Sequence, residues 1–131
     1  MTKPTLKVCV FCASRPGSSP AFTAAANSLA HALHSNSWSL IYGGGTRGLM
    51  GSVAKTLLDL GGTVHGFRVK ALIRREVNGD EEAGYGDTTV VESMHERKAL
   101  MAENADAFVA LPGGFGTLDE LVEIITWVGL P

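Results

Sequence analysis

The sequence is short of cysteine, of net charge and of long hydrophobic runs, and each shortage excludes a class of protein. Its 131 residues contain only Cys9 and Cys12, too few for a disulfide scaffold or a four-cysteine zinc site. The net charge of −2 favours neither nucleic acid nor an acidic membrane as a partner. No apolar run reaches the roughly 18 residues of a transmembrane helix, and the run after Lys7 is too short for a signal peptide. These shortages predict a cytoplasmic protein without metal, nucleic-acid or membrane partners.

The composition is that of one globular domain. Hydrophobic residues make up 45% of the chain and charged residues 18%, so residues 1–131 can bury a core without disulfides. Both cysteines lie in the run KVCVFC, which is typical of a strand, and their spacing places them on opposite faces of that strand. This placement favours buried structural cysteines over a redox or metal pair.

Hydrophobic runs typical of strands alternate along the chain with runs typical of helices. The strands are expected at 7–12, 38–42, 63–67, 88–92 and 106–111. The helices are expected at 18–36, 48–62, 93–104 and 117–128, and residues 68–86 are expected to be irregular. Strands joined by helical crossovers are parallel, and a parallel sheet is covered by helices on both faces. The pattern therefore predicts an α/β fold with a doubly wound parallel sheet.

Helix ends carry recognisable signals. Ser19 is placed to cap the first helix, and Ser93 with Glu96 has the spacing of a capping box. Gly61 or Gly62 is expected to end the second helix. No strand follows the last helix, so the fifth strand is expected at an edge of the sheet, covered by a partner subunit or by a further C-terminal segment.

Ligands of doubly wound sheets bind beyond the carboxyl ends of the strands, which draws attention to two glycine loops. The loop GGGTRG has the G-x-G-x-x-G spacing of Gly43, Gly45 and Gly48. A dinucleotide site would need an acid about 20 residues further on, where the chain has His65 and Arg68 instead, which argues against NAD. Tight strand–helix packing and contact with a phosphate or ribose both stay open for this loop.

The second glycine loop, LPGGFGT over residues 111–117, is a good phosphate cradle. The amides of residues 114–117 and the helix dipole would face an anion. Thr117 and Glu120 have capping-box spacing, and acids in the first turn suit the dipole. The apolar stripe of the last helix is predicted to be core: Leu118, Leu121, Val122 and Ile125.

The third helix begins with MHERK, which puts Arg97 and Lys98 one turn inside it, near the strand ends. A solvated basic face is the alternative interpretation of these two residues. His95 is expected to be exposed.

Taken together, PGGFGTLDE (112–120), MHERK (94–98) and GGGTRGLMG (43–51) resemble the Lonely guy family of cytokinin riboside 5'-monophosphate phosphoribohydrolases. The resemblance implies a Rossmann-like fold, a homodimer and no cofactor. It implies hydrolysis of the N-glycosidic bond of cytokinin riboside 5'-monophosphates and AMP, releasing free base and ribose 5-phosphate. The family usually continues with another strand and helix after ITW, and its first loop more often has C-G-S than CAS.

The resemblance also assigns residues. It implies that Arg97 and Glu120 are catalytic. The implied substrate-binding positions are Ser14, Gly44, Gly45, Glu76, Lys98, Gly113, Gly114, Phe115, Gly116, Thr117, Leu118, Asp119 and Thr126. No residue is assigned to a metal.

A nucleoside monophosphate explains why one loop combines a phosphate cradle with acids. Its phosphate is anionic, whereas its sugar becomes oxocarbenium-like and positive during glycosidic cleavage. Glu120 is therefore expected to act as a general base or to stabilise this cation, with Arg97 holding the ligand or Glu120. Three alternatives stay open: a broad nucleoside monophosphate phosphoribohydrolase, a non-catalytic nucleotide-binding module, and an inactive copy that only dimerises.

Overall fold

The computed structural model describes residues 5–12, 20–73, 84–111 and 115–128. Five strands form one sheet in the order β4-β3-β2-β1-β5, and every pairing is parallel. The strands are β1 (Lys7–Phe11), β2 (Ser39–Tyr42), β3 (Val64–Val69), β4 (Asp87–Val91) and β5 (Ala107–Ala110). The helices are α1 (Pro20–Ser35), α2 (Gly48–Asp59), α3 (Met94–Asn104) and α4 (Phe115–Val128). The predicted alternation is confirmed.

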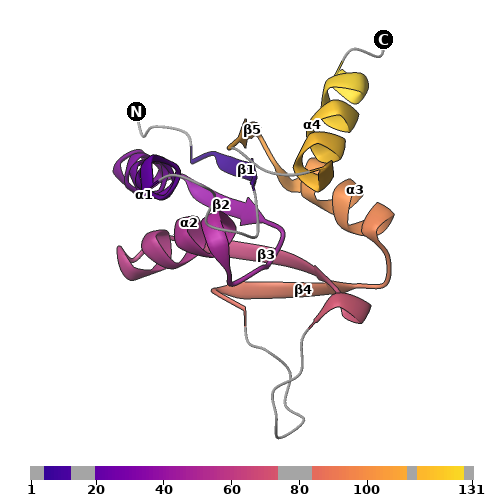
Figure 1. The fold of residues 1–131 in the computed structure, drawn as a ribbon, viewed down its shortest axis with the longest axis horizontal. Coiled ribbons are helices and arrows are strands. Elements are labelled where there is room, and N and C mark those ends of the chain that lie inside the picture. Colours follow the sequence, from indigo (N-terminus) through magenta and orange to yellow (C-terminus); the bar gives the residue numbers. More distant parts are fainter. Residues whose placement is uncertain (1–4, 13–19, 74–83, 112–114, 129–131) are drawn as a thin grey trace, which may run out of the picture.

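Helices cover both faces of the sheet, as a parallel sheet requires. Figure 1 shows α1 and α2 together on one side and α3 and α4 on the other. The first side is built on a cluster of thirteen buried residues, whereas the second has six buried residues among those described. Among the residues whose side chains are described, the larger buried cluster thus lies on the side of α1 and α2.

The two cysteines show this alternation of faces within one strand. Cys12 belongs to the larger cluster and Cys9 to the smaller one, and both are free and buried. Burial raises the pKa of both thiols, that of Cys12 to about 12. The prediction of buried structural cysteines on opposite faces is confirmed.

Two predicted helix ends are also present. The Ser93 Oγ accepts a hydrogen bond from the Glu96 amide at 3.1 Å, which caps α3, although the Glu96 carboxylate bonds the amide of Glu92. Gly61 follows α2 with a φ of +88°, a conformation that suits glycine. Its amide and that of Gly62 bond the carbonyls of Leu58 and Leu57.

Three predictions about local structure are wrong. β3 continues to Val69 and is followed by a short 3-10 helix, Lys70–Leu72, where irregular chain was predicted. α4 begins at Phe115, so Thr117 and Glu120 lie inside the helix and cannot form its N-terminal capping box.

The predicted apolar stripe of α4 is the third error. Leu118, Val122 and Ile125 are 55%, 52% and 61% exposed, while Glu120 and Ile124 face the sheet. The helix therefore turns a charged residue inward and three large apolar residues outward. β5, which precedes α4 in the chain, lies at the edge of the sheet, as predicted.

Candidate active site

The strand order reverses at β1, and this reversal locates the site. From β1 the chain builds outward through β2, β3 and β4, and β5 then pairs with the other side of β1. Ligands in doubly wound sheets bind at such a switch, beyond the carboxyl ends of the strands. α3 and α4, which follow β4 and β5, bring their first turns to this end of the sheet.

Each of these helices buries one charged residue and, four positions later, one apolar residue. In α3 the pair is Arg97 and Met101, and in α4 it is Glu120 and Ile124. Residues four apart share a face of a helix, so each apolar anchor holds its helix against the sheet. The charged residue lies one turn nearer the helix N-terminus and hence nearer the strand ends.

Arg97 is 9% exposed and is fixed to the sheet. Its Nε donates to the Phe67 carbonyl of β3 at 3.1 Å, and its Nη1 lies 3.5 Å from the Met94 sulfur. A buried charge is stable only when it is hydrogen-bonded or paired. The alternative interpretation of Arg97 as part of a solvated basic face is therefore wrong.

The first glycine loop lies directly against this arginine. A side chain on Gly43 would overlap the Arg97 guanidinium, and one on Gly44, whose φ is +81°, would overlap Arg68. The Gly45 amide donates to the sulfur of Met50 at 3.2 Å. Close packing is thus one reason for these glycines, because it brings Arg97 up to the backbone of the loop.

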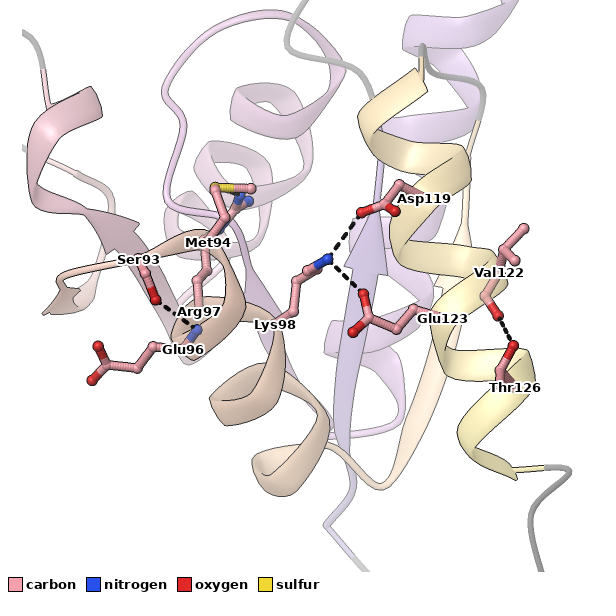
Figure 2. Close-up of polar contacts among 9 residues, drawn as sticks. All are labelled: Ser93, Met94, Glu96, Arg97, Lys98, Asp119, Val122, Glu123 and Thr126. Carbon is pink, nitrogen blue, oxygen red and sulfur yellow. Dashed lines mark hydrogen bonds and ion pairs between the residues drawn. The ribbon is translucent and has the colours of Figure 1, made fainter.

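Lys98 on α3 forms ion pairs with acidic residues of α4. Its Nζ lies 3.0 Å from Asp119 Oδ2 and 2.5 Å from Glu123 Oε2. Figure 2 shows Asp119 and Glu123 pointing from α4 toward Lys98, whereas Thr126 lies on the opposite side of α4. The hydrogen bonds that Lys98 donates to Glu123 and Asp119 raise its pKa, so its amine stays protonated.

Glu120 is the least exposed of the described charged residues at the site. It is 7% exposed, and its Oε2 is buried with no hydrogen-bond partner among the described residues. Burial raises the pKa of its carboxyl, against the lowering influence of Arg97 and Lys98. A buried, unsatisfied carboxylate is expensive for a fold, so its presence is the strongest indication of a functional group here.

Glu120 lines a small hollow together with Phe11, Lys98, Glu123 and Ile124. The space is about 180 Å³ and includes open solvent. The centre of the hollow has room for about one water molecule, so the described residues form part of the wall of a site and do not enclose a complete ligand pocket.

The structure brings together several of the predicted site residues. Arg97, Lys98, Asp119 and Glu120 gather at the switch point, with Gly44 and Gly45 beside Arg97. Thr126 does not join this group: it lies on the opposite side of α4, and its hydroxyl donates to the Val122 carbonyl of its own helix. Leu118 is exposed and makes no contact with the group that is described. Thr117 is half-buried in the first turn of α4.

Other predicted positions lie outside the described residues or lack a described side chain. Ser14, Glu76, Gly113 and Gly114 are among the former, as is the predicted cap Ser19. Phe115 and Gly116 are placed only as the first residues of α4.

The sequence interpretation missed three contributors: Glu123 as the partner of Lys98, and the methionines Met50 and Met94 beside the glycine loop and Arg97. The spacing of Asp119 and Glu123, four residues apart, does place them on one helix face. No local sequence pattern indicates that Asp119 and Glu123 face Lys98.

Within the described ranges, no group of three or more His, Cys, Asp or Glu residues is arranged to hold a metal ion. Nor is any described helix both long enough and apolar enough to span a bilayer.

The parallel sheet and its switch point define an α/β protein of Rossmann-like fold, and the charged cluster at its strand ends is the candidate ligand site. A family model described as "possible lysine decarboxylase" matches residues 50–131, more than half of the chain. The chain belongs to this family, which includes the Lonely guy proteins. The resemblance stated from the sequence motifs is confirmed.

Relatives with curated names extend over nearly the whole chain. It is 50% identical over 127 residues to a probable cytokinin riboside 5'-monophosphate phosphoribohydrolase of Oryza sativa subsp. japonica, covering 97% of this chain and 54% of that protein. It is 45% identical over 124 residues to a cytokinin riboside 5'-monophosphate phosphoribohydrolase of Arabidopsis thaliana, covering 95% and 53% respectively. The chain thus spans about half the length of these relatives.

Solved structures share the fold. A molybdenum cofactor carrier protein from Chlamydomonas reinhardtii matches with a TM-score of 0.77 at 21% identity, covering 95% of this chain and 73% of that one. A structural genomics target, TM1055, matches with a TM-score of 0.72 at 27% identity, covering 94% and 70%. The predicted doubly wound, Rossmann-like fold is confirmed.

Proposed function

We propose that the chain hydrolyses the N-glycosidic bond of cytokinin riboside 5'-monophosphates and of AMP, releasing the free base and ribose 5-phosphate. The observation that carries this proposal is the buried carboxylate of Glu120, which lines a hollow at the switch point and whose Oε2 has no partner in the ranges that the structure describes. The curated names of relatives up to 50% identical support the same activity.

The reaction replaces the bond between the anomeric carbon and the base nitrogen by a bond to a water oxygen. As the carbon–nitrogen bond breaks, its electron pair leaves with the base and the sugar becomes oxocarbenium-like. An ionised Glu120 stabilises this positive charge and accepts one proton from the attacking water, whose oxygen bonds the anomeric carbon. The departing base takes up a proton from the solvent, and Glu120 then returns its proton to the solvent. The low exposure of Glu120 strengthens this electrostatic effect.

Arg97 and Lys98 have complementary roles in this scheme. Arg97 contributes a fixed positive charge that favours the ionised form of Glu120. Lys98 sits at the rim of the hollow, 18% exposed, where an ammonium can bind an anionic group of the substrate. The glycine loop and first turn of α4 supply amides and a positive dipole end for the phosphate.

The description of the matched family, "possible lysine decarboxylase", is a second activity to consider. A lysine that forms a Schiff base must lose its proton, which a lowered pKa favours. At this site the opposite holds, because two carboxylates raise the pKa of Lys98. The site therefore favours glycosidic hydrolysis.

The decisive assay is incubation with AMP and isopentenyladenosine monophosphate, alongside the two unphosphorylated ribosides. Chromatography should detect free base and ribose 5-phosphate from the monophosphates but not from the ribosides. Glu120→Gln should abolish release, and Glu103→Gln, which neutralises an exposed acid on α3, should not. Release from the ribosides at an equal rate would contradict the phosphate anchor. Binding without release would favour the non-catalytic module.

We further propose that the active form is a cytoplasmic homodimer. The exposed Leu118, Val122 and Ile125 on α4 and the edge strand β5 offer an apolar surface that a second copy can cover. Sedimentation at assay concentration tests this proposal, and a fully active monomer would contradict it.

A further inference from the structure

The ion pairs of Lys98 do not include Glu120, the buried acid of the site. The ammonium bonds Asp119 and Glu123, although the carboxylate of Glu120 lines the same hollow as Lys98 and Glu123. Glu120 is the less exposed acid, and opposite charges attract more strongly where water is excluded. Within the described part of the chain, its Oε2 nevertheless has no partner. Something therefore keeps Lys98, which lines the same hollow, from pairing with it.

The geometry of α4 identifies the restraint. Asp119 and Glu123 are one helical turn apart, and Figure 2 shows that both reach Lys98. Glu120, which lies between them in the sequence, is buried instead. The two restraining acids are not equivalent. Glu123 is 23% exposed and 2.5 Å from the ammonium, whereas Asp119 is 65% exposed and 3.0 Å away. Exposed pairs contribute little, so Glu123 is the stronger anchor.

We propose that Glu123 is a positioning residue: by holding the Lys98 ammonium, it keeps that cation off the Oε2 of Glu120 and leaves this carboxylate available to the reacting sugar. The inference rests on the proposed function for its catalytic consequence. The arrangement of charges that it describes can be measured without substrate.

Several charged or titratable groups surround Glu120 and influence its proton. They are Arg97 and Lys98 on α3, Asp119 and Glu123 on α4, and the thiols Cys9 and Cys12 at β1. Burial keeps both thiols protonated, so the balance is set by two cations and two acids. Removing Glu123 changes the charge around Glu120 in two ways. One repelling negative charge is lost, and Lys98 is released.

The test is Glu123→Gln, with Glu123→Asp as the conservative variant and Glu103→Gln as the matched control on an exposed site. In carbon-13 NMR of labelled carboxyls, Glu123→Gln should move the titration of Glu120 to lower pH. With the nucleotide substrate, the acidic limb of the kcat profile should move the same way. The plateau kcat should fall by roughly 10- to 100-fold because Lys98 now occupies the general base. Glu123→Asp should recover part of this loss, and Glu103→Gln should match the wild type.

A Lys98→Met background separates restraint from simple charge repulsion. There, Glu123→Gln should shift the Glu120 titration much less than in the wild-type background, because no ammonium is left to release. Equal shifts in both backgrounds would overturn the proposal, as would an unchanged Glu120 titration in Glu123→Gln. If the wild-type chain releases no base, the proposed function fails, and the NMR titrations still decide whether Glu123 restrains Lys98. If Glu123→Gln does not fold, Glu123→Asp, whose shorter side chain weakens the hold on Lys98, should shift the Glu120 titration in the same direction by a smaller amount, and an unchanged titration would overturn the proposal.

Discussion

Replacing Glu120 with glutamine should make the protein inactive and more stable at the same time. The substitution keeps the size of the side chain but removes its charge from a site that is 7% exposed. If Glu120 acts as base and electrostatic stabiliser, kcat should fall by about 10²- to 10⁴-fold. The same change should stabilise the folded state, because it removes a buried charge whose Oε2 has no partner among the described residues.

The gain in stability has a defined size and pH dependence. A buried unsatisfied polar group costs roughly 1–3 kcal/mol, and more if it is charged. Glutamine keeps some unmet hydrogen bonds and loses attraction to Arg97 and Lys98, so we expect a net gain of about 1–2 kcal/mol, or roughly 4–8 °C in Tm. Burial raises the pKa of Glu120 above its value in the unfolded chain. The folded state therefore holds an extra proton between these two pKa values, and wild-type stability falls as pH rises through that window.

Urea unfolding of both proteins across pH 4.5 to 8, together with the nucleotide assay, checks this reasoning. The two unfolding curves should nearly coincide at the acidic end and separate as pH rises, with the variant more stable. A variant that is less stable at neutral pH, or that retains activity within tenfold of the wild type, would refute the role assigned to Glu120.

Three further perturbations have expected outcomes. Gly43→Ala should lower kcat by at least tenfold while the folded state persists in circular dichroism, because its Cβ would displace the Arg97 guanidinium. In urea unfolding of the dissociated monomer, Ile124→Ala should destabilise by about 2–4 kcal/mol, whereas Ile125→Ala, on the proposed dimer surface, should change stability by less than about 1 kcal/mol. These two neighbours are 8% and 61% exposed; equal losses would contradict the orientation of α4. Both thiols should resist a thiol reagent at pH 8 until guanidinium unfolds the chain, because burial raises the pKa of each, and rapid labelling of the folded protein would count against this.

The fold is largely legible from the sequence because its signals are local. The apolar runs of the five strands, the cap at Ser93 and the glycine at residue 61 each depend on a few neighbouring residues. The strand order is less direct. Periodicity predicts parallel pairing, but it does not say that β5 returns to the free side of β1.

The errors in α4 have a physical cause. An apolar stripe normally marks the face that meets the core, and Leu118, Val122 and Ile125 form one. α4 instead turns Glu120 and Ile124 to the sheet. A functional carboxylate has taken a position that packing alone would give to an apolar residue, and sequence rules fail at such sites.

The site is predictable only in part for a similar reason. The motifs identify Arg97 and Glu120, and the structure buries both of them at the switch point. The pairing of Lys98 with Glu123 joins helices separated by a whole strand, so no local pattern contains it. The support of Arg97 by the Phe67 carbonyl is equally remote in sequence.

The unequal hydrophobic clusters on the two faces of the sheet have a consequence for local unfolding. Among the residues whose side chains are described, thirteen form the cluster on the side of α1 and α2 and six form the cluster on the side of α3 and α4, where Arg97 and Glu120 are also buried. Segments with little buried apolar surface open at lower free energy than the whole domain. α3 and α4 should therefore exchange their amide hydrogens before α1 and α2, so that the chemical half of the domain opens while the other half stays folded.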